Sequence, residues 1–450
     1  MSLLFLVFAG SRILLHRCAL AVLLTVLVGA LPPVAHATEP ALSLVEAQRL
    51  AVERSRRVLA EDAALVAAQH MAVAARQLPD PVVTVGLDSW PVNGAHRFSV
   101  GGDDFTMGRV AVSQEWTRAS KRQLRAQHFD REGEKTQAEK AVLIATIQRE
   151  TASAWLERHY AEAMAALIVD QKKAAELEIT AADAAYRSGR GTQADLIATR
   201  SALAELDDRA NDIDQRLLVA KTALARWVGD AAELPLASKP DLESVRVDVN
   251  MLERELARHP EIAVLDRQEE LAWNAARLAE ADKRADWSVA LAYAQRGADF
   301  SDFVSVSVSI PLQWDQANRQ DREVAAKLAL AEQVGAERDE ALRSEVGEVR
   351  GRVQAWQSGR QRLKRYEREL IPLALARTEA TLAAFAAGRS STTEILRARR
   401  DEIDLHLRML ELEMGTARLW AQLNFLFPDD EAPPLASTDR DGAIVSEASK

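Results

Sequence analysis

The 450-residue sequence predicts a mainly α-helical protein with a β-barrel part, built from a duplicated unit of one β-hairpin and one long antiparallel helical hairpin. Three observations support this class. Long segments are rich in Ala, Glu, Arg, Leu and Gln while only 5% of the residues are aromatic, which favours long helices over a compact aromatic core. Short segments alternate apolar with small or polar residues, as strands with two unlike faces do. Several motifs recur about 200 residues apart, which indicates an internal repeat.

The first 37 residues are expected to be a secretory signal peptide. Arg12 and Arg17 give this segment a basic start, 19–30 is an apolar run, and residues 35–37 form a small-x-small cleavage pattern. The apolar run is short for a membrane-spanning helix, and an N-terminal anchor helix is the alternative. Cys18, the single cysteine, lies in this leader. The mature chain is therefore expected to contain no disulfide and no lipid anchor.

The charge of the mature chain argues against a nucleic-acid partner. Removal of the leader leaves 55 basic against 67 acidic residues, a net charge of −12, whereas nucleic-acid binding needs a basic face. After residue 37 we expect no stretch to be both apolar enough and long enough for a membrane helix. Integral contact with a membrane would then have to use β-strands.

The two units follow the same order of a helical run, a β-hairpin, a very long helical run and a returning helix. The first unit (38–229) places these elements at about 43–77, 82–116, 119–187 and 193–228. The second unit (250–427) places them at about 250–284, 286–313, 317–387 and 392–426. Residues 230–249 are expected to link the units, and the acidic, Pro- and Ser-containing tail, 428–450, is expected to be disordered.

The strand segments carry the signal for a membrane. In the segment 303–312, Val304, Val306 and Val308 point one way while Ser305 and Ser307 point the other. Such alternation, with aromatic residues near the ends of the segments, is typical of a spanning barrel wall that is apolar outside and polar inside. The aromatic residues are Trp90, Trp116, Trp287, Phe303 and Trp314. A half-buried sheet in a soluble domain would show the same alternation and is the alternative.

Four strands cannot close a barrel, because spanning barrels begin at about eight strands. An open sheet edge cannot lie in lipid, so a barrel requires an oligomer, and a homotrimer would give a 12-stranded wall. The very long helical runs would extend about 100 Å at 1.5 Å per residue. Their apolar positions recur at three- and four-residue steps, as in coiled coils. A soluble helical bundle or a solitary coiled-coil scaffold is the alternative.

The most specific repeat lies at the turns of the two helical hairpins. Ala185–Arg190 is echoed by Ala384–Arg389, so that an aromatic-x-x-Gly turn occurs twice. An acidic-aliphatic pair follows each turn, Asp195-Leu196 and then Glu394-Ile395, and one strand ends in the segment 309–312. On these residues the chain, over about 43–427, resembles the TolC-type outer-membrane efflux proteins.

This resemblance implies an outer-membrane β-barrel that continues into a periplasmic α-helical barrel. The implied assembly is a homotrimer in the outer membrane of a Gram-negative bacterium, in contact with outer-membrane lipid. The implied partners are a periplasmic adaptor protein and an inner-membrane, proton-driven pump of the resistance-nodulation-division type. The protein would be the outer-membrane channel of this tripartite efflux system, without enzymatic activity of its own.

A narrower resemblance is to the heavy-metal-cation branch of the same family, which exports cobalt, zinc, cadmium, copper or silver. It is carried by the segments 78–81, 104–107, 115–116 and 121–122. This resemblance implies heavy-metal cations as the cargo. A TolC-like channel for drugs or for type I protein secretion is the alternative within the fold, and a periplasmic coiled-coil adaptor is the alternative outside it.

The resemblance also implies two groups of functional residues. The tip that contacts the adaptor would comprise Tyr186, Gly189, Arg190, Phe385, Gly388 and Arg389. The pore constriction would comprise Asp195 and Glu394, six carboxylates in a trimer, which would attract cations and raise some of each other's pKa values. Arg397, where the family sometimes has a second acid, would offset part of this charge. Arg187, with Arg190 and Arg389, is a candidate for ion pairs that hold the tip closed.

No motif indicates an enzyme or a resident cofactor. The sequence contains no phosphate-binding loop, no G-x-S-x-G nucleophile elbow and no H-E-x-x-H helix. Its eight histidines are scattered, so no metal site in this chain is expected. A conduit needs weak contacts that release its cargo, which agrees with these expectations.

Overall fold

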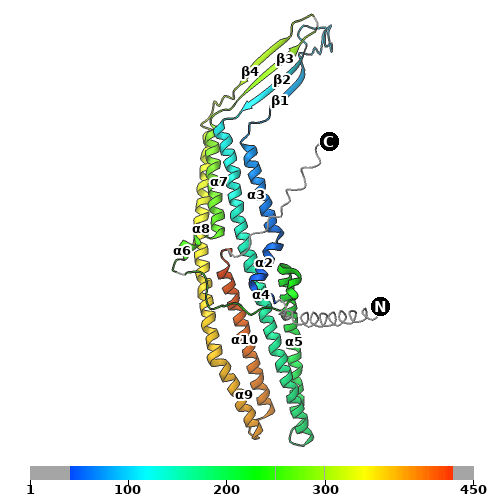
Figure 1. Cartoon of the computed structure of the whole chain (residues 1–450), viewed down its shortest axis with the longest axis vertical. Coiled ribbons are helices and arrows are strands. Elements are labelled where there is room, and N and C mark those ends of the chain that lie inside the picture. Colours follow the sequence, from blue (N-terminus) through cyan, green and yellow to red (C-terminus); the bar gives the residue numbers. More distant parts are fainter. Residues whose placement is uncertain (1–40, 249, 298, 429–450) are drawn as a thin grey trace, which may run out of the picture.

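The computed structural model describes residues 41–248, 250–297 and 299–428. The predicted signal peptide lies outside these residues, and so do residues 429–450 of the predicted tail. The described chain is a long rod of helices that carries one small sheet at one end (Figure 1). The longest helix, α4, runs along most of the rod and continues from the sheet to the opposite tip.

Both halves of the chain contribute the same kinds of element. The first half contains α2 (Leu44–Arg54), α3 (Arg56–Ala75), β1 (Val82–Asp88), β2 (Met107–Trp116), α4 (Ala119–Arg187) and α5 (Gln193–Val228). The second half contains α6 (Leu252–Leu256), α7 (Pro260–Asp282), β3 (Trp287–Gln295), β4 (Phe303–Ser309), α8 (Gln320–Arg365), η2 (Tyr366–Leu370), α9 (Ile371–Ala386) and α10 (Thr392–Asn424). The 3-10 helix η1 (Gly229–Glu233) opens the segment between the halves. The prediction of a mainly helical, duplicated fold with a small β part is confirmed.

Each of the first helical runs is divided into two helices. Ser55 has an extended backbone conformation and its hydroxyl accepts the N–H of Val58 at 3.3 Å, so it ends α2 and caps α3. In the second half α6 ends at Leu256, and Pro260 occupies the first turn of α7. Proline has no N–H and its fixed φ suits a first turn, so α7 begins anew instead of continuing α6.

The two long helical runs also differ. α4 is continuous over 69 residues, whereas α8 passes into α9 through the π-helical turn η2. Pro372 follows this turn and cannot donate the hydrogen bond that an α-helix would require from its nitrogen. The wider π turn accommodates this gap in the hydrogen-bond ladder. For the same reason β4 ends at Ser309, before Pro311, although alternation continues to residue 312.

The sheet is a simple antiparallel meander with the strand order β1-β2-β3-β4. One row across the four strands is Val83, Val112, Leu291 and Val306, and the next row on the same face is Val85, Val110, Tyr293 and Val304. The rows on the opposite face are Val82, Ser113, Ala290 and Ser307, and Thr84, Ala111, Ala292 and Ser305. The register therefore places almost all of the larger apolar side chains of these rows on one face.

α3 corrects the expectation that no helix after the leader would be apolar enough to span a membrane. Residues 56–75 pass that test by length and composition, the one helix of the described chain to do so. Its many alanines raise the mean hydropathy without giving the long aliphatic run that the expectation was based on. α3 packs along α4 through Val58, Ala68 and Ala72, so length and composition alone do not make it a membrane span.

The main core lies near the middle of the rod, where both halves and the linker meet. Trp155, Leu156 and Tyr160 of α4 are fully buried there, together with Leu224 of α5 and Leu423 of α10. The indole N–H of Trp155 donates to the carbonyl of Leu42 at 3.0 Å.

A buried cation also fastens the linker onto α4 at this level. Arg158 donates to the carbonyls of Ala232 and Leu234, at 2.5 and 2.9 Å, and its remaining Nε–H donates to Glu162. Because its charge is paired with Glu162 and each of its three nitrogens donates a hydrogen bond, this buried arginine is compatible with the core. The core therefore holds the middle of the rod together. From it, helices lead to the sheet in one direction and to the two hairpin turns in the other.

Candidate channel wall and tip

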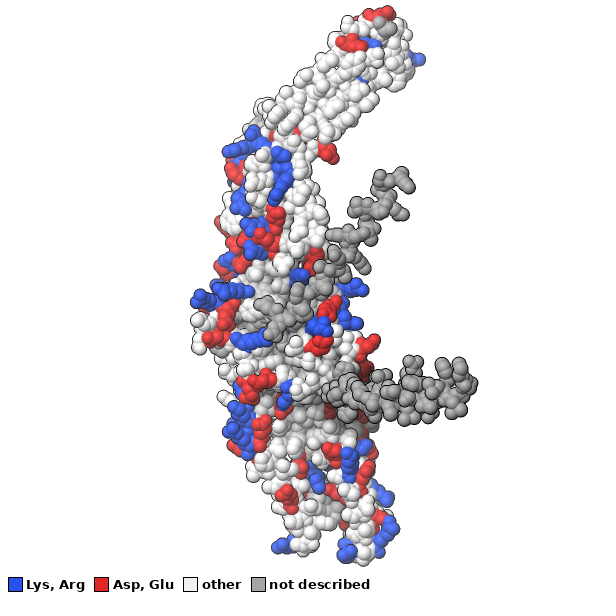
Figure 2. Space-filling view, viewed as in Figure 1, with Lys and Arg blue, Asp and Glu red and all other residues white. Residues whose placement is uncertain are grey.

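The apolar face of the sheet is exposed along its whole width. Val85, Val304 and Val306 are 75%, 71% and 70% exposed, and Leu291 is 55% exposed. Isolated exposed aliphatic residues are normal on a protein surface, but two complete rows form a contiguous patch that indicates contact with lipid or another chain. None of the described helices covers these rows. In the space-filling view the visible side of the sheet is nearly free of charge, with charged residues gathered at the far end of the sheet (Figure 2).

Aromatic residues lie at both ends of this apolar face. At the end next to the helices, the rings of Trp116 and Trp287 stack with centroids 5.1 Å apart. At the far end, Tyr293 lies on this face and its hydroxyl donates a hydrogen bond to Asp302. Rings with both apolar and polar contacts are typical of the two water interfaces of a membrane.

Both edges of the sheet are open. β1 pairs with β2, β4 pairs with β3, and neither outer strand has a second neighbouring strand within the described chain. Their outward N–H and C=O groups could pair with a further strand. Unpaired edges are incompatible with a hydrocarbon environment, so a sheet placed in lipid must be closed by other copies.

The two hairpin turns at the opposite tip have nearly the same backbone geometry. Gly189 has φ +71° and Gly388 has φ +69°, a region that favours glycine. A Cβ at either position would meet no atom within 4 Å, so backbone conformation rather than crowding favours glycine here. The N–H of Arg190 donates to Ala185 at 2.9 Å, and the N–H of Arg389 donates to Ala384 at 2.8 Å. Each helix is thereby closed by a glycine turn.

The predicted tip residues are all exposed on these turns. Tyr186 and Phe385 are 45% and 41% exposed, and Arg190 and Arg389 are exposed beside them. Arg187 pairs with Asp183 on its own helix. Within the described chain neither Arg190 nor Arg389 forms an ion pair. The hypothesis that these three arginines hold the tip closed is therefore not supported within one protomer.

Asp195 and Glu394 are the acidic members of two capping boxes, at the starts of α5 and α10. The carboxylate of Asp195 accepts the N–H of Thr192 at 3.1 Å and its hydroxyl at 2.6 Å, while the Thr192 hydroxyl accepts the N–H of Asp195. Glu394 and Ser391 form the same reciprocal capping box at the start of α10. A Ser or Thr followed three residues later by an acid is a local sequence signal for a capping box, and it occurs at both of these helix starts.

These hydrogen bonds lower the pKa values of both carboxylates. For Asp195 the largest cause is the Thr192 hydroxyl, followed by the Thr192 amide and then the side chain of Thr392, which belongs to the other hairpin. For Glu394 the largest cause is the hydroxyl of Ser390. Within one protomer the pKa therefore shifts in the direction opposite to that expected for a crowded ring of carboxylates. Arg397 lies exposed one turn beyond Glu394 and forms no ion pair in the described chain.

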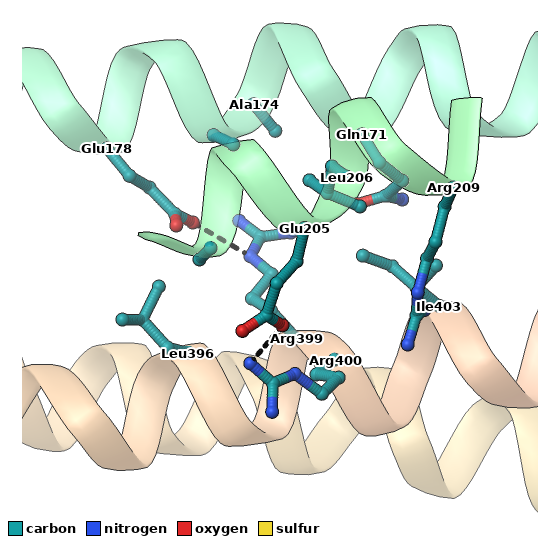
Figure 3. Close-up of a pocket in the computed structure, with 12 residues that line it drawn as sticks. Gln171, Ala174, Glu178, Glu205, Leu206, Arg209, Leu396, Arg399, Arg400 and Ile403 are labelled. Carbon is teal, nitrogen blue, oxygen red and sulfur yellow. Dashed lines mark hydrogen bonds and ion pairs between the residues drawn. The ribbon is translucent and has the colours of Figure 1, made fainter. Parts of the chain in front are cut away.

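Contacts between the two hairpins lie above the turns and were missed by sequence reasoning. A small pocket is lined by α4, α5 and α10, and two ion pairs bound it (Figure 3). Arg399 of α10 pairs with Glu178 of α4 at 3.0 Å, and Arg400 pairs with Glu205 of α5 at 2.5 Å. Further along the rod, Arg418 pairs with Glu157 at 2.6 Å. These pairs join residues that are 195 to 261 positions apart, and helical periodicity does not reveal which acid meets which arginine.

The described residues contain no group of three or more His, Cys, Asp or Glu side chains placed to hold a metal ion. The apolar face of the sheet and the two tips are therefore the features from which a function can be argued.

Comparison of the sequence with protein-family models and with curated proteins found no match. Solved structures are similar in fold. The outer membrane protein VceC of Vibrio cholerae matches with a TM-score of 0.69 and 17% identity, over 85% of this chain and 95% of VceC. CusC, solved in the context of folding and transmembrane channel formation, matches with a TM-score of 0.73 and 14% identity, over 86% of this chain and 92% of CusC. The open-state MtrE outer membrane channel of Neisseria gonorrhoeae matches with a TM-score of 0.64 and 12% identity, over 85% of this chain and 88% of MtrE. This chain therefore has the protomer fold of these outer-membrane channel proteins.

Proposed function

We propose that this chain is the outer-membrane channel component of a tripartite efflux system, a passive conduit of the TolC type and not an enzyme. The observation that carries the proposal is the sheet, which exposes complete Val, Leu and Tyr rows on one face and Ser, Thr and Ala rows on the other. A sheet with these two faces suits a wall with lipid on one side and water on the other. The fold shared with outer-membrane channels agrees with it.

The proposed assembly is a homotrimer closed by head-to-tail contacts. Three copies of the four-stranded sheet would pair β1 of one copy with β4 of the next and leave no edge in lipid. The helices next to the sheet follow the same side-by-side order as the strands, because α3 packs on α4, α4 on α7 and α7 on α8 (Figure 1). The outer helices α3 and α8 expose apolar residues, among them Val66 at 49% and Leu330 at 48%. The strand edges and the outer helices thus support one closing interface.

The proposed path runs through the sheet end and along the rod to the tip. The two glycine turns, with exposed Tyr186, Phe385, Arg190 and Arg389, would contact the periplasmic adaptor protein, which would connect the channel to an inner-membrane, proton-driven pump. Asp195 and Glu394 would line the narrowest part of the pore, with Arg397 beside them. Two observations support these roles. Equivalent residues occur in both hairpins, and both sets lie at the end of the rod farthest from the proposed membrane wall.

The proposed cargo is heavy-metal cations. The support is the resemblance carried by the segments 78–81, 104–107, 115–116 and 121–122 to the heavy-metal-cation branch. Cells that lack the gene should lose tolerance to one or more of cobalt, zinc, cadmium, copper and silver. An unchanged metal tolerance together with a loss of tolerance to drugs would contradict this cargo and leave the channel proposal intact.

The channel proposal is tested by cell fractionation followed by native mass measurement. We expect the protein in the outer-membrane fraction and, after detergent extraction, a mass three times that of the mature chain. An outer-membrane protein of known topology and a soluble periplasmic protein serve as fractionation controls. A soluble periplasmic monomer would overturn the proposal.

A further inference from the structure

One side of α8 and η2 carries an unusual concentration of cationic residues. Residues 350–370, to the end of η2, contain seven arginines and lysines and two carboxylates, Glu367 and Glu369. Arg352 pairs with Glu345 and Glu348, and Arg360 pairs with Glu243. The five remaining cations are all exposed and, within the described chain, form no ion pair. These residues, called here the basic side, are Arg350, Arg362, Lys364, Arg365 and Arg368.

The fold itself does not require the basic side. The opposite side of the same helix packs into the rod through Val353, Trp356 and Gly359, so the helix is already anchored. In the first repeat the corresponding stretch of α4, about 151–169, contains one arginine, Arg158, and two glutamates, Glu157 and Glu162. The basic side therefore belongs to the second repeat alone. Five like charges along about 27 Å of helix repel one another and attract an anionic partner.

The described chain ends close to this part of α8. The ring of Phe427 packs edge-on against the ring of His259, with centroids 5.6 Å apart. His259 in turn lies within electrostatic reach of Glu345 and Arg352 of α8. The end of the described chain thereby lies near residues 345–352 of α8, a stretch that contains Arg350, and the other four residues of the basic side lie about 18–27 Å further along the helix.

The sequence that continues from this point is acidic. Residues 429–450 contain six carboxylate side chains and two cationic side chains. The carboxylates belong to Asp429, Asp430, Glu431, Asp439, Asp441 and Glu447. A chain of this length can reach up to about 70 Å, more than twice the length of the basic side. The negative charge of residues 429–450, their length and the position of residue 428 are all compatible with contact between this segment and the basic side.

We propose that the acidic segment 429–450 binds the basic side of α8 and η2 in the same chain. Single exposed ion pairs are weak and are screened by salt, so the contact depends on several pairs acting together. Attachment at residue 428 raises the local concentration of the segment at the basic side, as in any tethered ligand. By occupying these cations, the segment keeps other anionic polymers off this part of the rod.

Zero-length carbodiimide cross-linking of the full mature chain tests the contact. The reagent activates a carboxylate, the Lys364 amine displaces the activating group, and an amide forms while the carbodiimide becomes a urea. We expect Lys364 to be joined to the tryptic peptides 419–440 or 441–450, whose carboxylates all lie beyond residue 428. Lys327 is the matched control, because it is exposed on the same helix but nearer the sheet. The Lys364 product should fall at least tenfold in 0.5 M NaCl and in the triple variant R362E/R365E/R368E.

Equal products at Lys327 and Lys364, or no response to salt and to the triple variant, would overturn the proposal. Products that form only between copies, in trimers mixed from 14N- and 15N-labelled chains, would overturn the assignment to the same chain. A second measurement uses binding of polyglutamate. A variant that ends at residue 428 should bind it at least tenfold more tightly than the full chain, and equal binding would count against the proposal. Failure here leaves the channel proposal untouched, because that proposal depends on the membrane fraction and the trimer mass.

Discussion

Asp195 and Glu394 occupy the third helical positions of α5 and α10, where each carboxylate accepts the amide N–H of its cap residue. An alanine at either position would remove the charge and the cap together. A loss of conductance in such variants could then come from a frayed tip rather than from the pore. Asparagine and glutamine separate the two effects, because a side-chain amide oxygen can still accept the same N–H.

We predict that the double variant D195N/E394Q reduces the cation preference of single channels in planar bilayers while the tip remains folded. The physical reason is the loss of the carboxylates from a shared constriction, since such rings concentrate cations. Ion selectivity from reversal potentials is the measurement, and amide hydrogen exchange at 192–196 and 391–395 reports the caps. D195A/E394A is the comparison, in which exchange at both helix starts should rise. An unchanged selectivity in D195N/E394Q would remove both residues from the pore.

The lowered pKa values also set the direction of the acid response. A carboxyl group whose pKa is lower in the folded protein contributes stability that is present above its unfolded pKa, about 3.9 for an aspartate. That stability is lost as the pH falls through the lower, folded pKa of Asp195. The cap of α5 should therefore persist at every pH from neutral to mildly acidic. Its loss belongs to strongly acidic solution.

At the scale of single elements, the two faces of the sheet differ clearly in polarity. Val306 is 70% exposed on the apolar face, and the neighbouring Ser307 lies on the opposite face. We predict that V306R sharply reduces the amount of trimer in the outer membrane, whereas S307R is tolerated. An arginine on the lipid face near the middle of a bilayer costs about 2–4 kcal/mol, while one that faces water does not. Trimer on a semi-native gel of the membrane fraction is the measurement. Equal yields from both variants would show that the faces are not lipid and water.

The elements also show how far the sequence could predict the fold. The strand faces follow from alternation, and the hairpin turns follow from Gly189 and Gly388, because both signals are local. The division at Ser55 carried a local signal too, a serine before a new helix, but the apolar periodicity around it hid the break. The π turn before Pro372 and the pair between Arg399 and Glu178 had no such signal, since they depend on three-dimensional packing. Local order was therefore predictable, and contacts between the halves were not.

At the scale of the whole molecule, a head-to-tail ring brings α3 of one copy against α8 of the next. The residues that meet must therefore lie at the same height along these two helices. Val66 lies ten residues before Arg76, the C-cap of α3 at its sheet end, and Leu330 lies ten residues after Gln320 at the sheet end of α8. At 1.5 Å per residue each lies about 15 Å from the sheet end of its own helix. The apolar patches of the outer helices are thus at the same level.

We predict that V66C/L330C forms disulfides between copies in the membrane, giving cross-linked dimers and trimers on a non-reducing gel. Cys18, within the predicted leader, is the single cysteine of the sequence, so the engineered pair should react without background. The variants V66C and L330C alone are the controls. Because the interface is heterologous, neither residue should meet its own copy. Cross-linking by either single variant would point to a two-fold contact and contradict the ring.

The short side chains of the Ser, Thr and Ala rows have a consequence for what can pass. In the rows through Val82 and Thr84, valine is the largest residue on the face opposite the lipid. If three copies enclose a duct with this lining, the rows on either side of it carry the longer side chains of Arg109 and Glu115 into the same bore. The segment that crosses the lipid would then be widest at the rows through Val82 and Thr84 and narrower at the rows of Arg109 and Glu115, so that the cargo meets a cation at one level and an anion at the other.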